Sequence, residues 1–234
     1  MSWGAYFAKG KWGEAISDFT RTIQLEPTNA AAYFNRGSVY RSAREFGKVI
    51  PDVNESLKLN PTNDLAYKLR ASIYSFRGEF RKAIADWNDG LRLNPKDANS
   101  LACRGTDYFN DGQFDEAVQD YREAIQFDSK NDLAYNNLAW LRATCPEAGV
   151  RNGQEAVELA TKACVLTNWK RWEWVETLAA SYAEKGDFTK AIKYQKQAMS
   201  IGVLSEADHK EMTHQLSLYE SRHPNHQGQQ AGRE

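Results

Sequence analysis

The 234-residue sequence has few of the residues that build chemical sites. Its three cysteines, Cys103, Cys145 and Cys164, are too few and of odd number, which argues against a disulfide framework. The cysteines are expected to be reduced thiols or, if the chain is exported, Cys145 and Cys164 can form a disulfide. All four histidines lie at or beyond His209, and the HPNH pattern near the end is a weak metal motif because proline interrupts it. With no paired carboxylates and no glycine-rich phosphate loop, we expect no catalytic residue, metal site or cofactor.

The sequence also lacks an excess of charge and any long apolar run. Thirty basic residues oppose 31 acidic ones, without a basic block, so nucleic acid is not an expected partner. No run approaches the roughly 18 apolar residues of a membrane span. The first residues, MSWGAYFAKGKW, lack the basic start and apolar run of a secretory signal. Localisation is therefore unknown: the cytoplasm is slightly favoured, and export is open if a signal was removed.

A period of 34 residues runs through most of the chain. The same interval separates the members of four columns, namely Pro27, Pro61 and Pro95; Tyr6, Tyr40, Tyr74 and Tyr108; Trp12, Phe46, Phe80 and Phe114; and Ala15, Val49, Ala83 and Ala117. Each period reads as two amphipathic helices. In the third, DLAYKLRASIYSFRG and FRKAIADWNDGLRLNP are the two segments, and Asn94-Pro95 stops the second helix. The pattern predicts a helical repeat array.

This pattern resembles the tetratricopeptide repeat (TPR). The first helix of this repeat has an aromatic, a small and a tyrosine position, which the third repeat fills with Tyr67, Ala71 and Tyr74. The second helix has an alanine, an aromatic and a small position before a proline, which it fills with Ala83, Trp87, Gly90 and Pro95. The resemblance covers about residues 1–201. It implies an all-α fold, a right-handed α-solenoid (superhelix) of antiparallel helix pairs, with about six TPR units and a C-terminal capping helix. The segment from Leu138 to Ala180 resembles a variant of the repeat that occurs in bacterial members of the family.

The expected organisation is a TPR array over 1–204, divided as 1–29, 30–63, 64–97, 98–131, 132–171 and 172–204, then a capping helix at 205–222 and a disordered tail at 223–234. The first unit starts near the sixth repeat position, which leaves Trp3, Tyr6 and Phe7 with little cover. The chain is expected to be a fragment of a longer array, or else this edge packs against another copy.

The fifth repeat is stretched. Ala117 and Ala156 are 39 positions apart, five more than the period. The segment CPEAGVRN is then an enlarged turn between the two helices, and Asn152 and Glu155 predict a cap for the second helix. The turn is interpreted as a structural variation, with an edge-binding loop as the alternative. Trp169, Trp172 and Trp174 follow it and either cover the widened gap or expose one interface anchor.

The resemblance implies that a concave groove, lined by the first helix of each repeat, binds a partner peptide. Mapped onto this chain, the groove residues are Phe34, Asn35, Arg41, Lys68, Phe76, Asn99, Thr106, Phe109, Asn136, Asn137 and Trp140. Asparagines can hydrogen-bond a peptide backbone in both directions and aromatics can form apolar pockets, although some of these residues can instead pack between helices. Leu65 and Leu69 stand where the carboxylate clamp of the family's co-chaperones needs cations, so that form of binding is not expected.

The sequence thus predicts a non-enzymatic protein-protein interaction scaffold that binds a partner protein or peptide of unknown identity. The alternative is a structural module that self-associates, as a homo-oligomer, through the N-terminal repeat edge or the enlarged loop of the fifth repeat.

Overall fold

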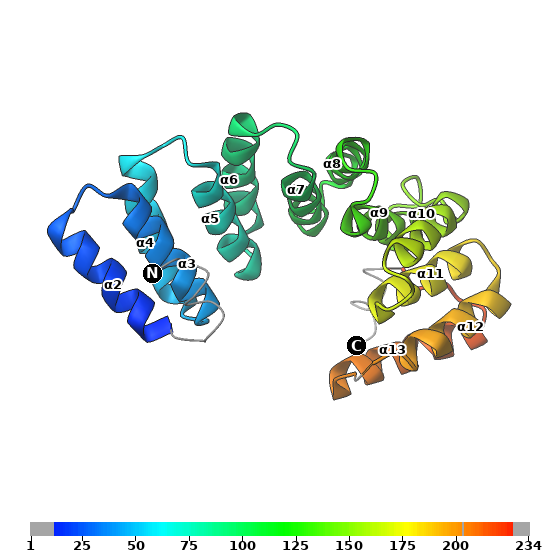
Figure 1. Ribbon diagram of the computed structural model, residues 1–234. Helices are drawn as coiled ribbons and strands as arrows, with labels where there is room; N and C mark the ends of the chain where they lie inside the picture. The colour runs from blue at the N-terminus through cyan, green and yellow to red at the C-terminus, as the bar shows by residue number, and fades with distance from the viewer. Residues whose placement is uncertain (1–11, 203, 227–234) are drawn as a thin grey trace, which may run out of the picture. The chain divides into compact units, whose positions relative to one another are not determined.

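The computed structural model describes residues 12–202 and 204–226, and all regular secondary structure in these two ranges is α-helical (Figure 1). The helices are α2 (Trp12–Leu25), α3 (Ala30–Ser42), α4 (Phe46–Leu59), α5 (Asp64–Phe76), α6 (Phe80–Leu93), α7 (Ala98–Asn110), α8 (Phe114–Phe127), α9 (Asp132–Thr144), α10 (Gly153–Leu166), α11 (Trp172–Glu184), α12 (Phe188–Met199) and α13 (Glu206–Glu220). The predicted all-α repeat fold is confirmed. Trp3, Tyr6 and Phe7 lie outside the described residues.

The chain forms two compact units, Met1–Ser100 and Leu101–Glu234. In the N-terminal unit α3 packs on α4 and α5 on α6. In the C-terminal unit α9 packs on α10 and α11 on α12, while α13 packs on α12 (Figure 1). Each consecutive pair is one first helix and one second helix of a repeat, as the period predicts.

The first helices share a capping residue that recurs at the repeat interval. Asn29, Asn63 and Asn131 each accept a hydrogen bond from the backbone N–H three residues later, at 2.9 to 3.3 Å. Asp97 takes the same place before α7 and accepts from Ser100. A side-chain acceptor at this position satisfies one of the unpaired N–H groups of the first turn, which fixes where each helix begins.

The turns inside the repeats are also built alike. The carbonyls of Tyr40, Tyr74, Tyr108 and Tyr182 each accept a hydrogen bond from the N–H five residues later, at 2.8 to 2.9 Å. This closure needs a left-handed residue just before the donor. Gly78, Gly112 and Gly186 supply it with φ values of 72, 81 and 87°, whereas Arg44 supplies it with φ 59°.

Small and large residues interlock between the helices, as the columns predict. Ala71 and Ala83 are fully buried, and Trp87 is 5% exposed. Gly105 allows a close approach: a Cβ there would lie 2.9 Å from the ring of Tyr121. Distances this short force a shift of neighbouring atoms, so a small residue is required where the two helices of this repeat meet.

In the second, third and fourth repeats, a partly buried ion pair joins the first helix to the second helix. Arg36, Arg70 and Arg104 each bind both carboxylate oxygens of an aspartate sixteen residues later, Asp52, Asp86 and Asp120 respectively, at 2.7 to 2.8 Å. Hydrogen bonding to the aspartate raises the pKa of Arg36 and of Arg70. Each of these two arginines also donates to the preceding repeat, Arg36 to Thr20 and Arg70 to Asn54. The fork geometry of arginine therefore holds three helices together.

The fifth and sixth repeats replace these pairs by apolar residues. Leu138 and Leu159 take the arginine and aspartate places in the fifth repeat, and Leu178 and Tyr194 take them in the sixth. Leu138 and Leu178 are each 1% exposed, and Leu159 and Tyr194 pack against the core of the C-terminal unit. The same geometric place is thus filled by charge in one part of the array and by hydrocarbon in another.

Candidate functional site on the first helices

The predicted groove residues divide between the two units. Phe34 to Asn99 belong to the N-terminal unit, and Thr106 to Trp140 to the C-terminal unit. In the N-terminal unit the predicted apolar positions differ in exposure. Phe34 packs against the core around Val49 and Val53. Phe76 at the end of α5 is 71% exposed, and its ring lies 4.8 Å from that of Phe46. Leu65, at the start of α5, is 52% exposed. Two large apolar groups on one helix are therefore open to a ligand.

The polar groove positions of this unit are partly occupied by internal partners. The ammonium group of Lys68 binds Asp64 at 2.8 Å and also pairs with Asp97. Burial lowers the pKa of Lys68, but these hydrogen bonds outweigh it and the pKa is raised. Arg41 and Asn99 are exposed, and Asn35 is partly buried. The charge of Lys68 is thus paired with two carboxylates inside the protein. Arg41 is the more exposed of the two basic side chains.

A polar network joins α9, α7 and α8 in the C-terminal unit. The Nδ2 of Asn136 donates to Oδ1 of Asn137 at 3.3 Å, and Nδ2 of Asn137 donates to Oγ1 of Thr106 at 3.0 Å. The same Thr106 oxygen accepts from the hydroxyl of Tyr121 at 3.2 Å. Burial raises the pKa of Tyr121, which keeps this hydroxyl a proton donor. Asn137 and Thr106 are therefore hydrogen-bonded to each other between helices, and their part in peptide binding stays a prediction.

One atom of this network has no partner. Asn136 is 6% exposed, and its Oδ1 accepts no hydrogen bond within the described chain. A buried acceptor without a partner costs about 1–3 kcal/mol relative to a satisfied one. Nearby, Trp140 packs against Ala143, Ala156 and Ala180, and the ring of Phe109 lies 5.7 Å from that of Phe114. The site thus offers an unused acceptor beside partly buried aromatic surface.

The enlarged loop of the fifth repeat is tied to its own repeat and to the next. Nη1 of Arg142 donates to the carbonyl of Val150 at 2.6 Å, and Nη1 of Arg151 donates to that of Cys145 at 2.7 Å. Nε of Arg151 also binds Glu184 at the end of α11, at 3.0 Å. Asn152 caps α10, as the sequence predicts, by accepting from the N–H of Glu155. Arg142 of α9 and Arg151 of the loop therefore hold the loop backbone in place.

One tryptophan of the next junction is buried and the other two are partly buried. Trp174 is 5% exposed and its indole N–H donates to Asp132 at 2.9 Å, while Trp169 and Trp172 pack against the same core. All three side chains therefore help to fill the core between these repeats, and an interface role for Trp169 or Trp172 stays a prediction. The three cysteines are free thiols, so the Cys145–Cys164 bridge is not formed in this structure.

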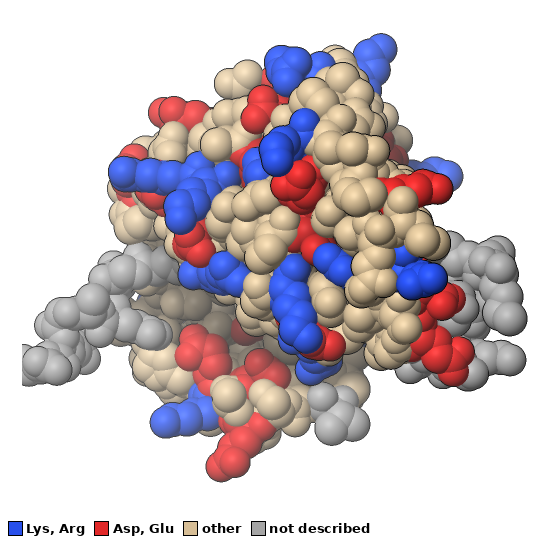
Figure 2. All heavy atoms as spheres, turned by 90° about the vertical axis from the view of Figure 1, so that its left-hand side faces the viewer, with Lys and Arg blue, Asp and Glu red and all other residues tan. Residues whose placement is uncertain are grey.

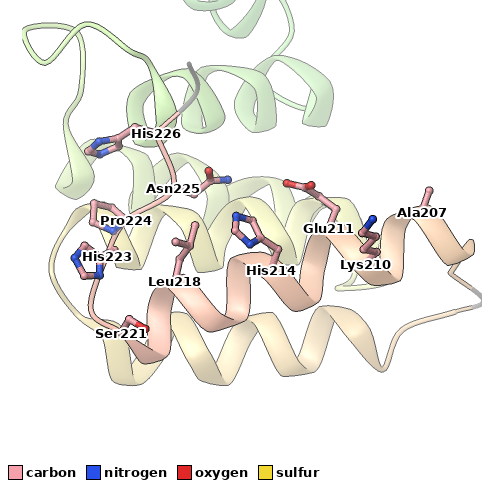
Figure 3. Close-up of a pocket in the computed structure, with 10 residues that line it drawn as sticks. All are labelled: Ala207, Lys210, Glu211, His214, Leu218, Ser221, His223, Pro224, Asn225 and His226. Atoms are coloured by element: carbon pink, nitrogen blue, oxygen red, sulfur yellow. The ribbon is translucent and has the colours of Figure 1, made fainter. Parts of the chain in front are cut away.

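A hollow of about 880 Å³ lies beside α13 (Figure 3). Lys210, His214 and Leu218 project from one side of the helix, and Pro224 to His226 close the end. His226 pairs with Glu184 at 2.6 Å, so residues 223–226 lie against α11; the rest of the predicted tail lies outside the described residues. The described ranges contain no group of three or more His, Cys, Asp or Glu residues that could hold a metal ion.

The surface charge is mixed. Figure 2 shows Lys and Arg side chains interspersed with Asp and Glu side chains over the face that it presents. Many of these charges pair locally, as in Lys48–Glu45 and Lys82–Glu79. Within the described ranges, no helix is long and apolar enough to cross a membrane.

Sequence profiles and solved structures identify relatives of this chain. A profile described as "TPR repeat" matches residues 5–42 and 105–141, and one described as "Tetratricopeptide repeat" matches residues 176–201. No curated protein matches the sequence.

Three solved structures are similar in fold. A tetratricopeptide repeat protein from Parabacteroides merdae ATCC 43184 is 22% identical with a TM-score of 0.76, over 93% of this chain and 84% of that one. YrrB, described as a TPR protein with an unusual peptide-binding site, is 18% identical with a TM-score of 0.64, over 84% and 96% of the two chains. MamA is 19% identical with a TM-score of 0.56, over 91% and 98%. The chain therefore contains tetratricopeptide repeats and has the fold of tetratricopeptide repeat proteins, which generally act as non-enzymatic scaffolds for protein–protein interaction.

Proposed function

We propose that the chain binds a partner segment on its first-helix faces and so acts as an interaction scaffold. The observation that carries this proposal is the unpartnered Oδ1 of Asn136, which is buried beside Trp140 on α9. The Asn136 side chain is 6% exposed, so it must turn toward the groove before a peptide backbone N–H can reach this oxygen. An apolar peptide side chain would then pack against the aromatic surface. The exposed Leu65 and Phe76 on α5 offer a second, apolar contact area in the N-terminal unit.

A displayed peptide library selected on the purified chain, followed by calorimetry with the selected peptides, tests the proposal. Removing the acceptor by Asn136→Ala should weaken a peptide bound in the C-terminal unit about tenfold, the value of one desolvated hydrogen bond. Phe76→Ala should weaken a peptide bound in the N-terminal unit by a similar factor. Gln126→Ala, which removes an exposed amide from a second helix, is the matched control and should leave both affinities unchanged.

Unchanged affinity in both Asn136→Ala and Phe76→Ala would refute groove binding. Self-association through the N-terminal edge or the enlarged loop is the alternative, and light scattering addresses it: a monomer at micromolar concentration argues against it, and a concentration-dependent mass supports it.

A further inference from the structure

The turns inside the second and third repeats carry an excess of basic residues. Residues 41–48 and 75–82 span the two turns, and together they contain six lysines and arginines but two glutamates. Both turns lie at the same end of the N-terminal unit, because the connection between α4 and α5 lies at the opposite end of these helices (Figure 1). In the fourth repeat the matching segment, 109–116, has three acidic residues and no basic one. The positive charge is therefore a property of these two repeats and not a requirement of the turn.

An aromatic side chain lies open beside these charges. Phe76, the last residue of α5, is 71% exposed. The centroid of its ring lies 4.8 Å from that of Phe46, the first residue of α4, with 42° between the ring planes. Arg77 joins the same two helices, since its Nη2 donates to the carbonyl of Phe46 at 3.3 Å. The two turns therefore meet around one apolar contact that has a cation next to it.

The two glutamates of this region already have cationic partners, whereas its arginines are open. Each glutamate binds the lysine three residues later, at 2.5 to 2.6 Å, in the pairs Glu45–Lys48 and Glu79–Lys82. Arg41 and Arg44 are exposed, and neither forms an ion pair with another residue of the described ranges. Nη1 of Arg77 lies 4.0 Å from Oε1 of Glu79, which is too far for a hydrogen bond. These guanidinium groups can therefore bind an external carboxylate.

Arg44 occupies a position that glycine fills more easily. Its φ of 59° is left-handed, and the matching residues of the other short turns are Gly78, Gly112 and Gly186. A Cβ makes this conformation less favourable than it is for glycine. The second repeat thus keeps an exposed cation at a conformational cost. A cost of this kind points to a role outside the stability of the turn.

The basic turn surface consists of Arg41, Arg44, Phe46, Phe76 and Arg77. We propose that it binds an internal acidic segment of a partner protein, with one aromatic or aliphatic side chain among its carboxylates. The apolar side chain packs on the open ring of Phe76, and Arg44 and Arg77 donate hydrogen bonds to the carboxylates. This inference rests on the proposed function, because it names the kind of segment that the N-terminal unit takes.

The arrangement favours a peptide over a nucleic acid. Glu45 and Glu79 interrupt the arginines, whereas a phosphate backbone is bound by a continuous basic stripe. Single strands also stack on successive aromatic side chains, and on this surface Phe46 is partly buried while Phe76 is open. The segment needs no chain end either, since its carboxylates are side chains and the arginines lie at the turns. This separates it from a carboxylate clamp in the groove.

Fluorescence anisotropy of the full chain with a labelled peptide tests the proposal. The probe has one phenylalanine between two pairs of glutamates and is acetylated and amidated, so it has no charged ends. Its counterpart with four glutamines should bind at least about tenfold more weakly. Arg44→Gly should weaken the acidic peptide about threefold to tenfold, and Arg44→Gly/Arg77→Ala more than about tenfold. Phe76→Ala should weaken both peptides.

The matched control is Arg222→Gly, the same exchange at a left-handed arginine after α13 in the C-terminal unit, and it should leave the affinity unchanged. Because Arg44→Gly relieves a strained position, weaker binding in that variant cannot be a consequence of unfolding. Circular dichroism of each variant checks this point.

Equal affinity for the acidic peptide and its glutamine counterpart would overturn the proposal, as would unchanged binding in Arg44→Gly/Arg77→Ala. Competition by single-stranded oligouridylate as strong as that by unlabelled peptide would overturn it too, because the surface would then be a general polyanion site. If peptides selected on the chain lose affinity in Asn136→Ala while the acidic probe does not bind, this inference fails and the proposed function stands.

Discussion

At the scale of single residues, the arginine–aspartate pairs are the most informative feature. In each pair the aspartate side chain is 4–8% exposed and the arginine side chain 17–21%. Removing one partner from such a pair leaves a poorly solvated charge, whereas replacing both by apolar residues is often neutral. The chain makes that double replacement itself, with Leu138 and Leu159.

The variant Asp86→Leu should lower the free energy of unfolding by about 2–4 kcal/mol, because Arg70 keeps its charge without its partner. The double variant Arg70→Leu/Asp86→Leu, which copies the fifth repeat, should recover at least about 1 kcal/mol of that loss. Urea unfolding of the wild type, both single variants and the double variant measures the coupling. A double variant less stable than either single variant would contradict this account.

Gly153 is required by a neighbouring backbone. A Cβ at this position would lie 2.5 Å from the backbone nitrogen of Lys185, whereas one at Gly149 in the same loop would meet nothing within 4 Å. Gly153→Ala should therefore destabilise the chain by about 2 kcal/mol or more, and Gly149→Ala should change stability by less than about 0.5 kcal/mol. Thermal unfolding of the two variants side by side is sufficient, and similar melting temperatures would exclude a tight contact at Gly153.

At the scale of the helices, the short turns before α4, α6, α8 and α12 have the same backbone but use two kinds of residue at the left-handed position. The left-handed position is glycine before α6, α8 and α12 but Arg44 before α4. Glycine adopts this conformation without steric cost, whereas other residues pay roughly 1 kcal/mol, offset in part by the greater freedom of unfolded glycine. The turn at the end of α13 is closed in the same way, with Arg222 at φ 60° and a 2.8 Å bond from His223 to Leu218.

Arg44→Gly should therefore stabilise the N-terminal unit slightly, by up to about 1 kcal/mol, and Gly78→Ala should destabilise it by about 1 kcal/mol. Chemical denaturation followed by circular dichroism measures both changes. Opposite signs are the essential outcome, and two changes of the same sign would mean that the turn is limited by something other than its φ angle.

Much at the scale of elements could be predicted from the sequence. The segment DLAYNNLAWLRAT is α9 from its first residue to its last, and the Asn152 cap is present. The columns Arg36–Arg70–Arg104 and Asp52–Asp86–Asp120 have the same interval and could have predicted the ion pairs. The burial of Asn136 and the pairing of Lys68 could not be predicted, because both depend on which side chains a neighbouring helix brings close.

At the scale of the whole molecule, the array combines two compact units with different internal chemistry. The N-terminal unit contains the ion pairs of the second and third repeats, and the C-terminal unit contains the ion pair of the fourth repeat and the apolar fifth and sixth repeats. In repeat proteins stability is a sum of local terms, so a defect acts mainly on its own repeat and on the next one. A mutation in one unit should therefore lower the stability of that unit more than the stability of the other unit.

Leu178→Ala, which empties a 1%-exposed position in α11, should destabilise by about 2–4 kcal/mol and speed hydrogen exchange mainly in α9 to α12. Val49→Ala, at a fully buried position in α4, should act mainly on α3 to α5. Native-state exchange of both variants gives reciprocal patterns if the units open separately. Uniform acceleration along the whole chain in either variant would show instead that the chain opens as one cooperative unit.

The arginines that bind the preceding repeat limit how freely these repeats can be rearranged. Arg70 requires Asn54 behind it, and Arg36 requires Thr20. Where Leu138 replaces the arginine, the matching position on the preceding second helix is Arg122, which pairs with Glu155 instead. A unit moved from one half of the chain to the other would bring leucine against Asn54 or a second cation against Arg122. These contacts therefore restrict the order of the repeats. In a chain with rearranged repeats, the residue on a first helix and its partner on the preceding second helix must be exchanged together.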